Sequence, residues 1–307
     1  MKKVIGLLLM LFFILFDFNG SNAEASELTA EQVKHLESLG FSQEEILNLP
    51  EEEIAKNLEI EGEVVATDKK FFKVIENEIS NDDQILSTNN TNELSNKGVV
   101  IEVDEETYLK EVQLAQAKEQ TYSSGSHNTS YKTVTTTIVS LKAKQQYRVK
   151  TSINWSIMPK NRKIDVIGTS VNSSFWAPSP GSQYGQQSWS VKHSCDKIKY
   201  LNTTYSSGSN LWSKGSSGYA LKIDLPNNIV KSYACFSETV QTLSAFTYYT
   251  ADKLAATSQI DAYGKYLHQE TTTQLSPAIT FYPVSFAVSA SQSDKFTESD
   301  THAQVKF

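Results

Sequence analysis

The sequence lacks most of the local patterns that announce an enzyme. Its five histidines are scattered, and none shows the short paired spacing of zinc ligands. No glycine-rich loop precedes a predicted helix, so nucleotide binding has no support. The sequence therefore singles out no catalytic residue, no cofactor and no metal site. A hydrolase is the less favoured alternative, because folding could still bring together distant carboxylates such as Asp165, Asp224 and Asp261.

Long apolar runs are also absent, except at the start of the chain. Lys2 and Lys3 precede the apolar residues 4–16, which lead to Ala-Glu-Ala at 23–25. This is the layout of a secretory signal peptide, and the run is shorter than the roughly 18 residues that a membrane span needs. We predict a signal peptide over residues 1–25, with cleavage after Ala25, or after Ala23 as a variant. The mature chain is expected to be extracellular, either secreted or associated with the cell envelope.

Cysteine is scarce, with only Cys195 and Cys235 in the chain. Disulfides persist in the extracellular environment that the signal peptide implies. We therefore predict a disulfide between these two residues, which would contribute on the order of 4 kcal/mol of chain entropy. Two free thiols are the alternative.

Charge divides the mature chain into two parts of opposite sign. Residues 26–120 contain 8 Lys+Arg and 23 Asp+Glu, a net charge of −15, whereas residues 121–307 contain 18 and 10, a net charge of +8. Gly, Ser and Asn cluster at 121–130, where the sign changes, which is typical of a linker. We predict an acidic helical or α+β domain over 26–120 and a basic β-sandwich domain over 131–307.

The acidic part begins with helix signals. Thr29 with Gln32 and Ser42 with Glu45 have capping-box spacing, and Gly40 suits a helix C-terminus. Residues 50–58 favour a third short helix that starts near Pro50. These pieces are too short to be stable alone and must pack on something else.

The rest of the acidic part is less regular. Residues 64–79 fit either strands or a helix, and residues 80–97 are polar, as in a linker. A strand at 99–103 and a helix over 105–118 are expected to follow.

The basic part has the period of two that is typical of strands. In 147–157, Tyr147, Val149 and alternate residues after them would share one face, with Arg148 and Lys150 on the other. A turn at 158–161 and a return arm at 163–175 would complete a hairpin. Further strands are predicted at 132–141, 188–193, 197–204, 219–225, 229–249, 257–268, 279–289 and 304–307. Many short strands at this spacing indicate a mainly β fold with a small helical part, an antiparallel β-sandwich or Greek-key barrel.

Two sets of side chains are candidates for ligand binding. One set is basic and would attract an anionic polymer or membrane surface; its members are Arg148, Lys150, Lys160, Arg162 and Lys163. The alternative is a solvated face turned toward the chain's own acidic part. The second set is aromatic and could stack on sugar rings or close the end of a core; it comprises Trp176, Trp189 and Trp212.

Residues 28–58 and 153–168 resemble segments of uncharacterised secreted proteins of Gram-positive spore formers. The resemblance covers less than a fifth of the chain and implies secretion without a known activity.

Two functional hypotheses remain from the sequence. The first is a secreted, non-enzymatic binding module for the cell envelope or another anionic polymer, without specific nucleic-acid binding. The second is a β-pore-forming toxin or bacteriocin-like factor, in which the acidic part is an inhibitory pro-segment, because strands of about 10 alternating residues suit a membrane barrel. The ligand and the oligomeric state are left open.

Overall fold

The computed structural model describes residues 28–76, 98–121, 128–142, 145–193, 195, 197–229, 237–271 and 273–307. In these residues the protein is mainly β, as predicted, with four α-helices and two large antiparallel sheets. The predicted signal peptide and most of the linkers at 80–97 and 121–130 lie outside the described residues.

Three short helices open the described chain: α1 (Ala30–Ser38), α2 (Gln43–Asn48) and α3 (Glu51–Leu58). Both predicted capping boxes are present. The side chains of Thr29 and Ser42 accept hydrogen bonds from the third backbone N–H of their helices, and Gln32 and Glu45 complete the boxes. Gly40 has a φ of +83°, the left-handed conformation expected of a residue that ends a helix.

The larger sheet has the strand order β2-β1-β3-β4-β11-β7-β8, and β6 pairs with β11. Its strands are β1 (Gly62–Ile75), β2 (Val99–Val103), β3 (Thr129–Leu141), β4 (Gln146–Ile157), β6 (Trp176–Pro178), β7 (Tyr184–His193), β8 (Ile198–Tyr205) and β11 (Glu238–Lys253). Helix α4 (Glu105–Thr121) follows β2. Residues 64–75, which belong to the segment that fitted either strands or a helix, thus lie in the long strand β1.

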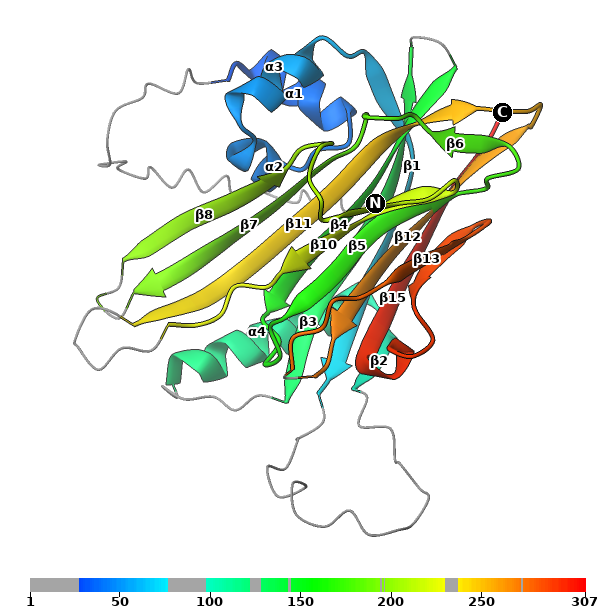
Figure 1. The fold of residues 1–307 in the computed structure, drawn as a ribbon. Helices are drawn as coiled ribbons and strands as arrows, with labels where there is room; N and C mark the ends of the chain where they lie inside the picture. Colours follow the sequence, from blue (N-terminus) through cyan, green and yellow to red (C-terminus); the bar gives the residue numbers. More distant parts are fainter. Residues whose placement is uncertain are drawn as a thin grey trace, which may run out of the picture.

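The smaller sheet has the order β15-β12-β5-β10-β9 and packs on one face of the larger sheet (Figure 1). Its strands are β5 (Ile164–Val171), β9 (Trp212–Lys214), β10 (Gly218–Asp224), β12 (Gln259–Gln269) and β15 (Phe296–Lys306). A separate hairpin, β13 (Ile279–Tyr282) with β14 (Ser285–Val288), replaces the single strand predicted at 279–289; a 3₁₀ turn at Ser293–Lys295 precedes β15. Both sheets end in open edge strands, so the described strands form the sandwich of the two predicted architectures.

The core lies between the two sheets. Val149, Ile153 and Trp155 of β4 are almost fully buried there, together with Ile167 and Leu221 of the smaller sheet. The alternation in 147–157 therefore predicted the inward face of β4 correctly, because successive side chains of a strand point to opposite sides.

The predicted hairpin of 147–157 with 163–175 is wrong. β4 pairs with β3 and β11 in the larger sheet, whereas β5 pairs with β10 and β12 in the smaller one. The turn after Ile157 crosses from one layer to the other. Alternation and a turn signal are the same for a hairpin and for such a crossing, so the local pattern could not distinguish them.

The charge division does not coincide with a division of the sheets. β1, from the acidic part, pairs along its length with β3, from the basic part. Phe72 and Val74 of β1 are buried in the same core cluster as Ile153 and Trp155. The described residues of both parts therefore share one interior.

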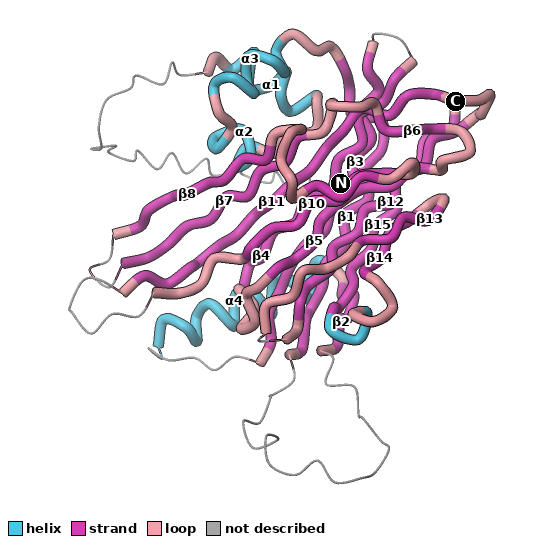
Figure 2. Tube along the Cα trace, in the orientation of Figure 1, coloured by secondary structure: helices cyan, strands magenta, loops and turns pink. Residues whose placement is uncertain are grey.

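The helices cover the outer face of the larger sheet at two places (Figure 2). At one end, Leu36, Leu39 and Phe41 of the α1–α3 segment pack on Phe246 and Tyr248 of β11. Toward the other end, Tyr108 and Val112 of α4 pack on Tyr131 and Ile157. We call residues 28–60 the helical cap.

Candidate functional site

Two of the predicted anion-binding residues lie beneath the helical cap. Arg148 and Lys150 are each only 2% exposed. They project from the outer face of β4, the face predicted for them, but the cap covers that face. They are therefore not available to an external polyanion, and the expectation that they contact one is corrected. The alternation of a strand tells which residues share a face but not what packs on it.

Carboxylates of the cap balance these two cations. Lys150 Nζ lies 2.5 Å from Glu45 Oε2 and donates to the carbonyl oxygen of Gly40 at 2.7 Å. Burial lowers the pKa of Lys150, and the Glu45 carboxylate opposes that shift. The Arg148 guanidinium lies over the Tyr248 ring at 4.2 Å, and the Tyr248 hydroxyl donates to Glu53. The acidic cap thus neutralises the basic residues that it covers.

The other three predicted basic residues lie at the opposite end of β4. The backbone N–H of Lys160 donates to both carboxylate oxygens of Glu76 at 2.9 and 3.0 Å. Arg162 donates from Nη1 to Asn228 Oδ1 at 2.7 Å, and Lys163 directly precedes β5. Since Arg148 and Lys150 are a strand's length away, the five residues do not form one basic patch.

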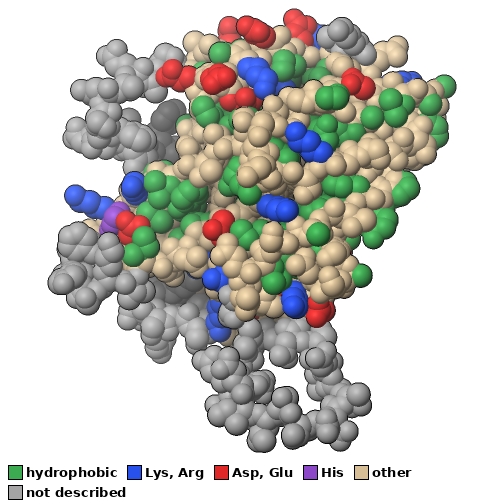
Figure 3. Space-filling view, viewed as in Figure 1, with side chains coloured by type: hydrophobic (Ala, Val, Ile, Leu, Met, Phe, Trp, Pro, Cys, Tyr) green, Lys and Arg blue, Asp and Glu red, His purple; other side chains and the backbone are tan. Residues whose placement is uncertain are grey.

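A different basic cluster projects from the molecule. Lys192 is the penultimate residue of β7, Lys197 directly precedes β8, and Lys199 is the second residue of β8. The register pairs Lys192 with Ile198 and Lys199 with Val191. Lys197 and Lys199 therefore share one face at the end of this strand pair, and Lys192 lies on the other face. Ile198 and Tyr200 of β8 are 54% and 57% exposed. In Figure 1, β7, β8 and the adjoining end of β11 extend past the smaller sheet. Figure 3 shows basic side chains and a histidine at that end, next to an acidic side chain; Glu238 of β11 lies 3.6 Å from His193. We call Lys192 and residues 197–200 the basic tip.

Two of the three candidate tryptophans are buried. Trp176 is 1% exposed and its indole N–H donates to the carbonyl of Gln259 at 3.1 Å; Trp212 is 8% exposed. Neither offers a ring face for stacking on sugar, so this expectation is corrected in favour of the alternative that loop tryptophans close a core. Trp189 is half-buried and packs against the main core.

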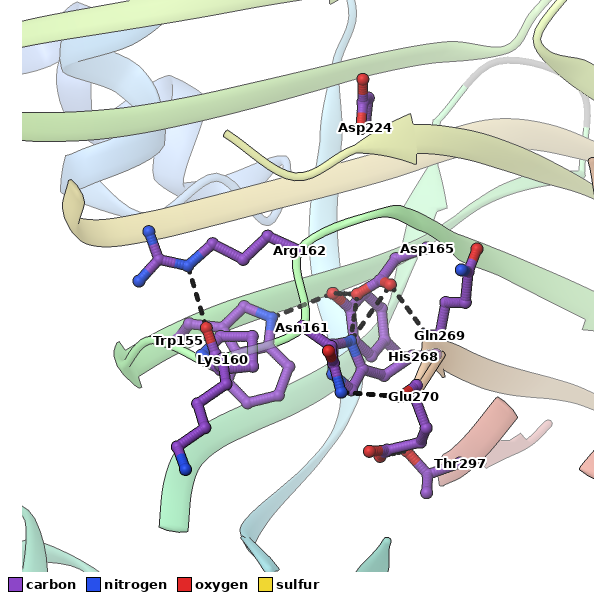
Figure 4. Close-up of polar contacts among 12 residues, drawn as sticks. Trp155, Lys160, Asn161, Arg162, Asp165, Asp224, His268, Gln269, Glu270 and Thr297 are labelled. Carbon is purple, nitrogen blue, oxygen red and sulfur yellow. Dashed lines mark hydrogen bonds and ion pairs between the residues drawn. The ribbon is translucent and has the colours of Figure 1, made fainter. Parts of the chain in front are cut away.

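A polar cluster inside the sandwich was not anticipated. Asp165 and His268 are both fully buried, and His268 Nδ1 lies 2.9 Å from Asp165 Oδ2. The Asp165 carboxylate also accepts from the Tyr266 hydroxyl and from the Gln269 backbone N–H at 3.0 Å. Trp155 Nε1 donates to the Tyr266 hydroxyl at 2.9 Å. Figure 4 shows these groups converging between β5 and β12.

Further charges surround this cluster. Lys132 Nζ lies 4.7 Å from the Trp155 ring centre and has no hydrogen-bond partner among the described residues. Burial lowers the pKa of Lys132 to about 8, opposed by the carboxylates of Asp165, Glu270 and Glu76. Because these groups have no access to solvent, the arrangement can stabilise or destabilise the fold but cannot reach a substrate.

The pKa of His268 predicts a pH-dependent stability. Burial alone would lower that pKa, but the charge of Asp165 and its hydrogen bond raise it above 6.5, with Glu270 adding to the rise and Lys132 opposing it. Because the folded state binds the His268 proton more tightly than the unfolded state, protonation stabilises the fold, and this contribution is complete below pH 6.5. The contribution is lost as the pH rises through the folded-state pKa. We expect the unfolding free energy of the wild type, minus that of His268→Gln, to decrease from pH 6.5 upward.

Urea denaturation of both proteins between pH 5.5 and 8.5 measures this difference. His35→Gln serves as the control, since His35 lies in the helical cap and its Nε2 contacts the backbone carbonyls of Asn57 and Ile60. A difference that stays constant with pH would show that His268 does not bind an extra proton in the folded state.

The three carboxylates considered for a hydrolase do not form one site. Asp165 is enclosed in the core, whereas Asp224 is exposed on β10 and lies apart from the cluster in Figure 4. Asp261 accepts hydrogen bonds from Gln259, His302 and Gln304 at another end of the sandwich. No pair flanks a shared cleft, as glycoside hydrolysis requires. The described residues also contain no group of three His, Cys, Asp or Glu side chains placed to hold a metal ion.

The predicted disulfide involves a residue outside the described part of the chain. Cys195 lies in the exposed turn between β7 and β8, but Cys235 is among residues 230–236, which the structure does not describe. The pairing therefore stays a prediction. Among the helices of the described residues, none has both the length and the apolar character needed to cross a bilayer.

Comparison with known proteins identifies no family for this chain. No family model and no curated protein matches the chain. A solved structure named "Pore forming protein" aligns with 59% of this chain and 89% of its own, at 7% identity and a TM-score of 0.29. A similarity of this size supports no inference about fold or function.

Proposed function

We propose that the protein is a secreted, non-enzymatic binding protein that attaches to an anionic polymer of the cell envelope through its basic tip. The observation that carries the proposal is that three lysines lie at the end of one projecting strand pair. Lys197 and Lys199 are on one of its faces, and Lys192 is on the other face with the exposed Ile198 and Tyr200. Clustered lysines attract a polyanion, and neighbouring apolar side chains add contact area once it is bound.

The position of the basic tip supports this role. It lies at the end of β7 and the start of β8, the edge strand of the larger sheet, and away from the acidic helical cap. Electrostatic attraction at such a surface is worth about 1 kcal/mol per lysine near an anionic layer. Lysines on an edge strand also prevent pairing between sheets of different molecules, so the test must separate these two roles.

The test is the double substitution Lys197→Glu and Lys199→Glu in the mature chain. We expect binding to purified cell walls that carry teichoic acid to weaken by at least about tenfold, and wild-type binding to weaken with added salt. Lys110→Glu with Lys306→Glu is the charge-matched control on exposed residues elsewhere. Sedimentation of the protein with the walls measures both.

Equal wall binding by the two double variants would overturn the proposal. If the tip variant alone aggregates while its wall binding is unchanged, the lysines protect the edge strand instead. Binding to walls stripped of teichoic acid identifies the ligand. If binding is retained, the ligand is another anionic component of the wall.

A membrane-inserting protein held inactive by its helical cap is the second candidate. One observation favours it: the contact between the cap and the sheet, although largely apolar, includes the buried Glu45–Lys150 ion pair. A buried ion pair holds two surfaces together less strongly than apolar side chains of equal volume. Dye release from anionic liposomes tests it, with the intact mature chain and with a chain cut at a protease site placed between Glu59 and Glu61. No leakage from either sample would remove this candidate.

A further inference from the structure

Two adjoining hollows lie at the end of the sandwich where β6, β11 and β12 meet. One, of about 290 Å³, is lined by Asn172, Phe175, Trp176, residues 256–259 and Asp261. The other, of about 490 Å³, is lined by Gln145, Gln146 and residues 252–256, which include Asp252 and Lys253. Ala256 contributes to both. Their sizes are comparable with sites for small ligands, about 300–1,000 Å³.

The lining of the smaller hollow combines an aromatic ring with hydrogen-bonding groups. Phe175 is half-buried and offers an apolar surface, while Trp176 forms part of the buried wall behind it. Asn172 Oδ1 accepts from the Ser174 backbone N–H at 3.1 Å, and in the described part of the chain its Nδ2 donates to no protein acceptor. Asn172 and Phe175 thus both line the smaller hollow.

Among the described residues that line the smaller hollow, the one ionisable group is a carboxylate. Asp261 is 5% exposed and accepts hydrogen bonds from Gln259 at 2.8 Å, His302 at 2.9 Å and Gln304 at 2.5 Å. Burial raises its pKa, but these hydrogen bonds outweigh burial and leave the pKa below its ordinary value. A fixed negative charge repels anionic ligands and accepts hydrogen bonds from hydroxyl groups.

From these groups we infer that the smaller hollow binds an uncharged carbohydrate, with a sugar ring against Phe175 and its hydroxyl groups bonded to Asp261 and Asn172. Aromatic surfaces pack on the apolar faces of sugar rings, and carboxylate and amide groups bond the hydroxyls. The larger hollow, which shares Ala256 with the smaller one, would hold the next sugar unit of a chain. This site is separate from the basic tip, and the smaller hollow is lined by a carboxylate in place of lysines.

The test uses three soluble neutral trisaccharides: maltotriose, cellotriose and triacetylchitotriose. We expect at least one to bind the mature chain in calorimetric titration, and Phe175→Ala to weaken that binding by about tenfold or more. Because this variant removes packing, Asn172→Asp is the second variant: it keeps the oxygen that accepts from Ser174 and replaces the free amide donor by a charge. It is also expected to lose most of the affinity. Tyr282→Ala, at a 52% exposed aromatic on β13, is the control.

Three results would overturn the inference: no heat of binding from any trisaccharide at millimolar concentration, equal affinity of Phe175→Ala and Tyr282→Ala, or equal affinity of Asn172→Asp and the wild type. The Lys197→Glu, Lys199→Glu variant is expected to bind the sugar normally, without dependence on salt. Failure of the sugar site and failure of the basic tip are therefore distinguishable.

Discussion

Replacing Asp165 by alanine is expected to destabilise the folded protein by about 3–5 kcal/mol. The Asp165 side chain is fully buried and is the partner of His268, Tyr266 and the Gln269 backbone. Its removal leaves His268 and the buried Lys132 without their nearest negative charge in the core. Removing one member of a buried ion pair is costly because the remaining charge stays desolvated. The urea midpoint at pH 6, where His268 is protonated, measures the loss.

Two comparisons separate this effect from general damage to the fold. Asp224→Asn on the neighbouring strand β10 removes an exposed carboxylate and is expected to change stability by less than about 0.5 kcal/mol. The combined Asp165→Asn and His268→Gln protein is expected to be destabilised by less than the sum of the two single variants, because the residues are in contact. Additive losses would mean that the two side chains do not act as a pair.

The sequence could not have revealed this cluster. Asp165 and His268 are separated by 103 residues, and each occupies an ordinary position in an alternating strand. They meet because β5 pairs directly with β12, which is a property of strand order. Strand order depends on the balance of all the pairings and not on any short pattern. The one local signal was an ionisable residue on a partly apolar strand face, Lys132 beside Val134 and Ile138 of β3.

The features that could be predicted from the sequence are those that depend on residues close together in the chain. The capping boxes at Thr29 and Ser42 placed α1 and α2, and the alternation in 147–157 placed β4, because both depend on residues a few positions apart. The positions of Arg148 and Lys150 on the outer face were also correct. Their burial was missed, since it results from a cap whose Glu45 lies 105 residues away. The lysines of the basic tip are different, because they fall on the neighbouring strands predicted at 188–193 and 197–204, and the pairing of β7 with β8 brings those strands together.

Truncation of the chain from its N-terminal side is expected to have the second large effect, on whether the protein folds. A chain that begins at residue 129 is expected not to fold, whereas one that begins at Gly62 is expected to keep both sheets. The shorter chain loses β1, which pairs with β3 along its length and buries Phe72 and Val74 in the main core. It would leave β3 as a long unpaired edge beside a gap, which is a site for aggregation. The longer chain loses only the helical cap.

The outcome is read from near-ultraviolet circular dichroism and from thermal unfolding. We expect a cooperative transition for 62–307, at a lower temperature than for the mature chain, and none for 129–307. The chain 62–307 should also bind a hydrophobic dye, because removal of the cap uncovers Phe246 and Tyr248. A cooperative transition and native-like dichroism for 129–307 would instead show that the change of charge near residue 121 marks two independently folding domains, and that β1 only lies against a sheet that is stable without it.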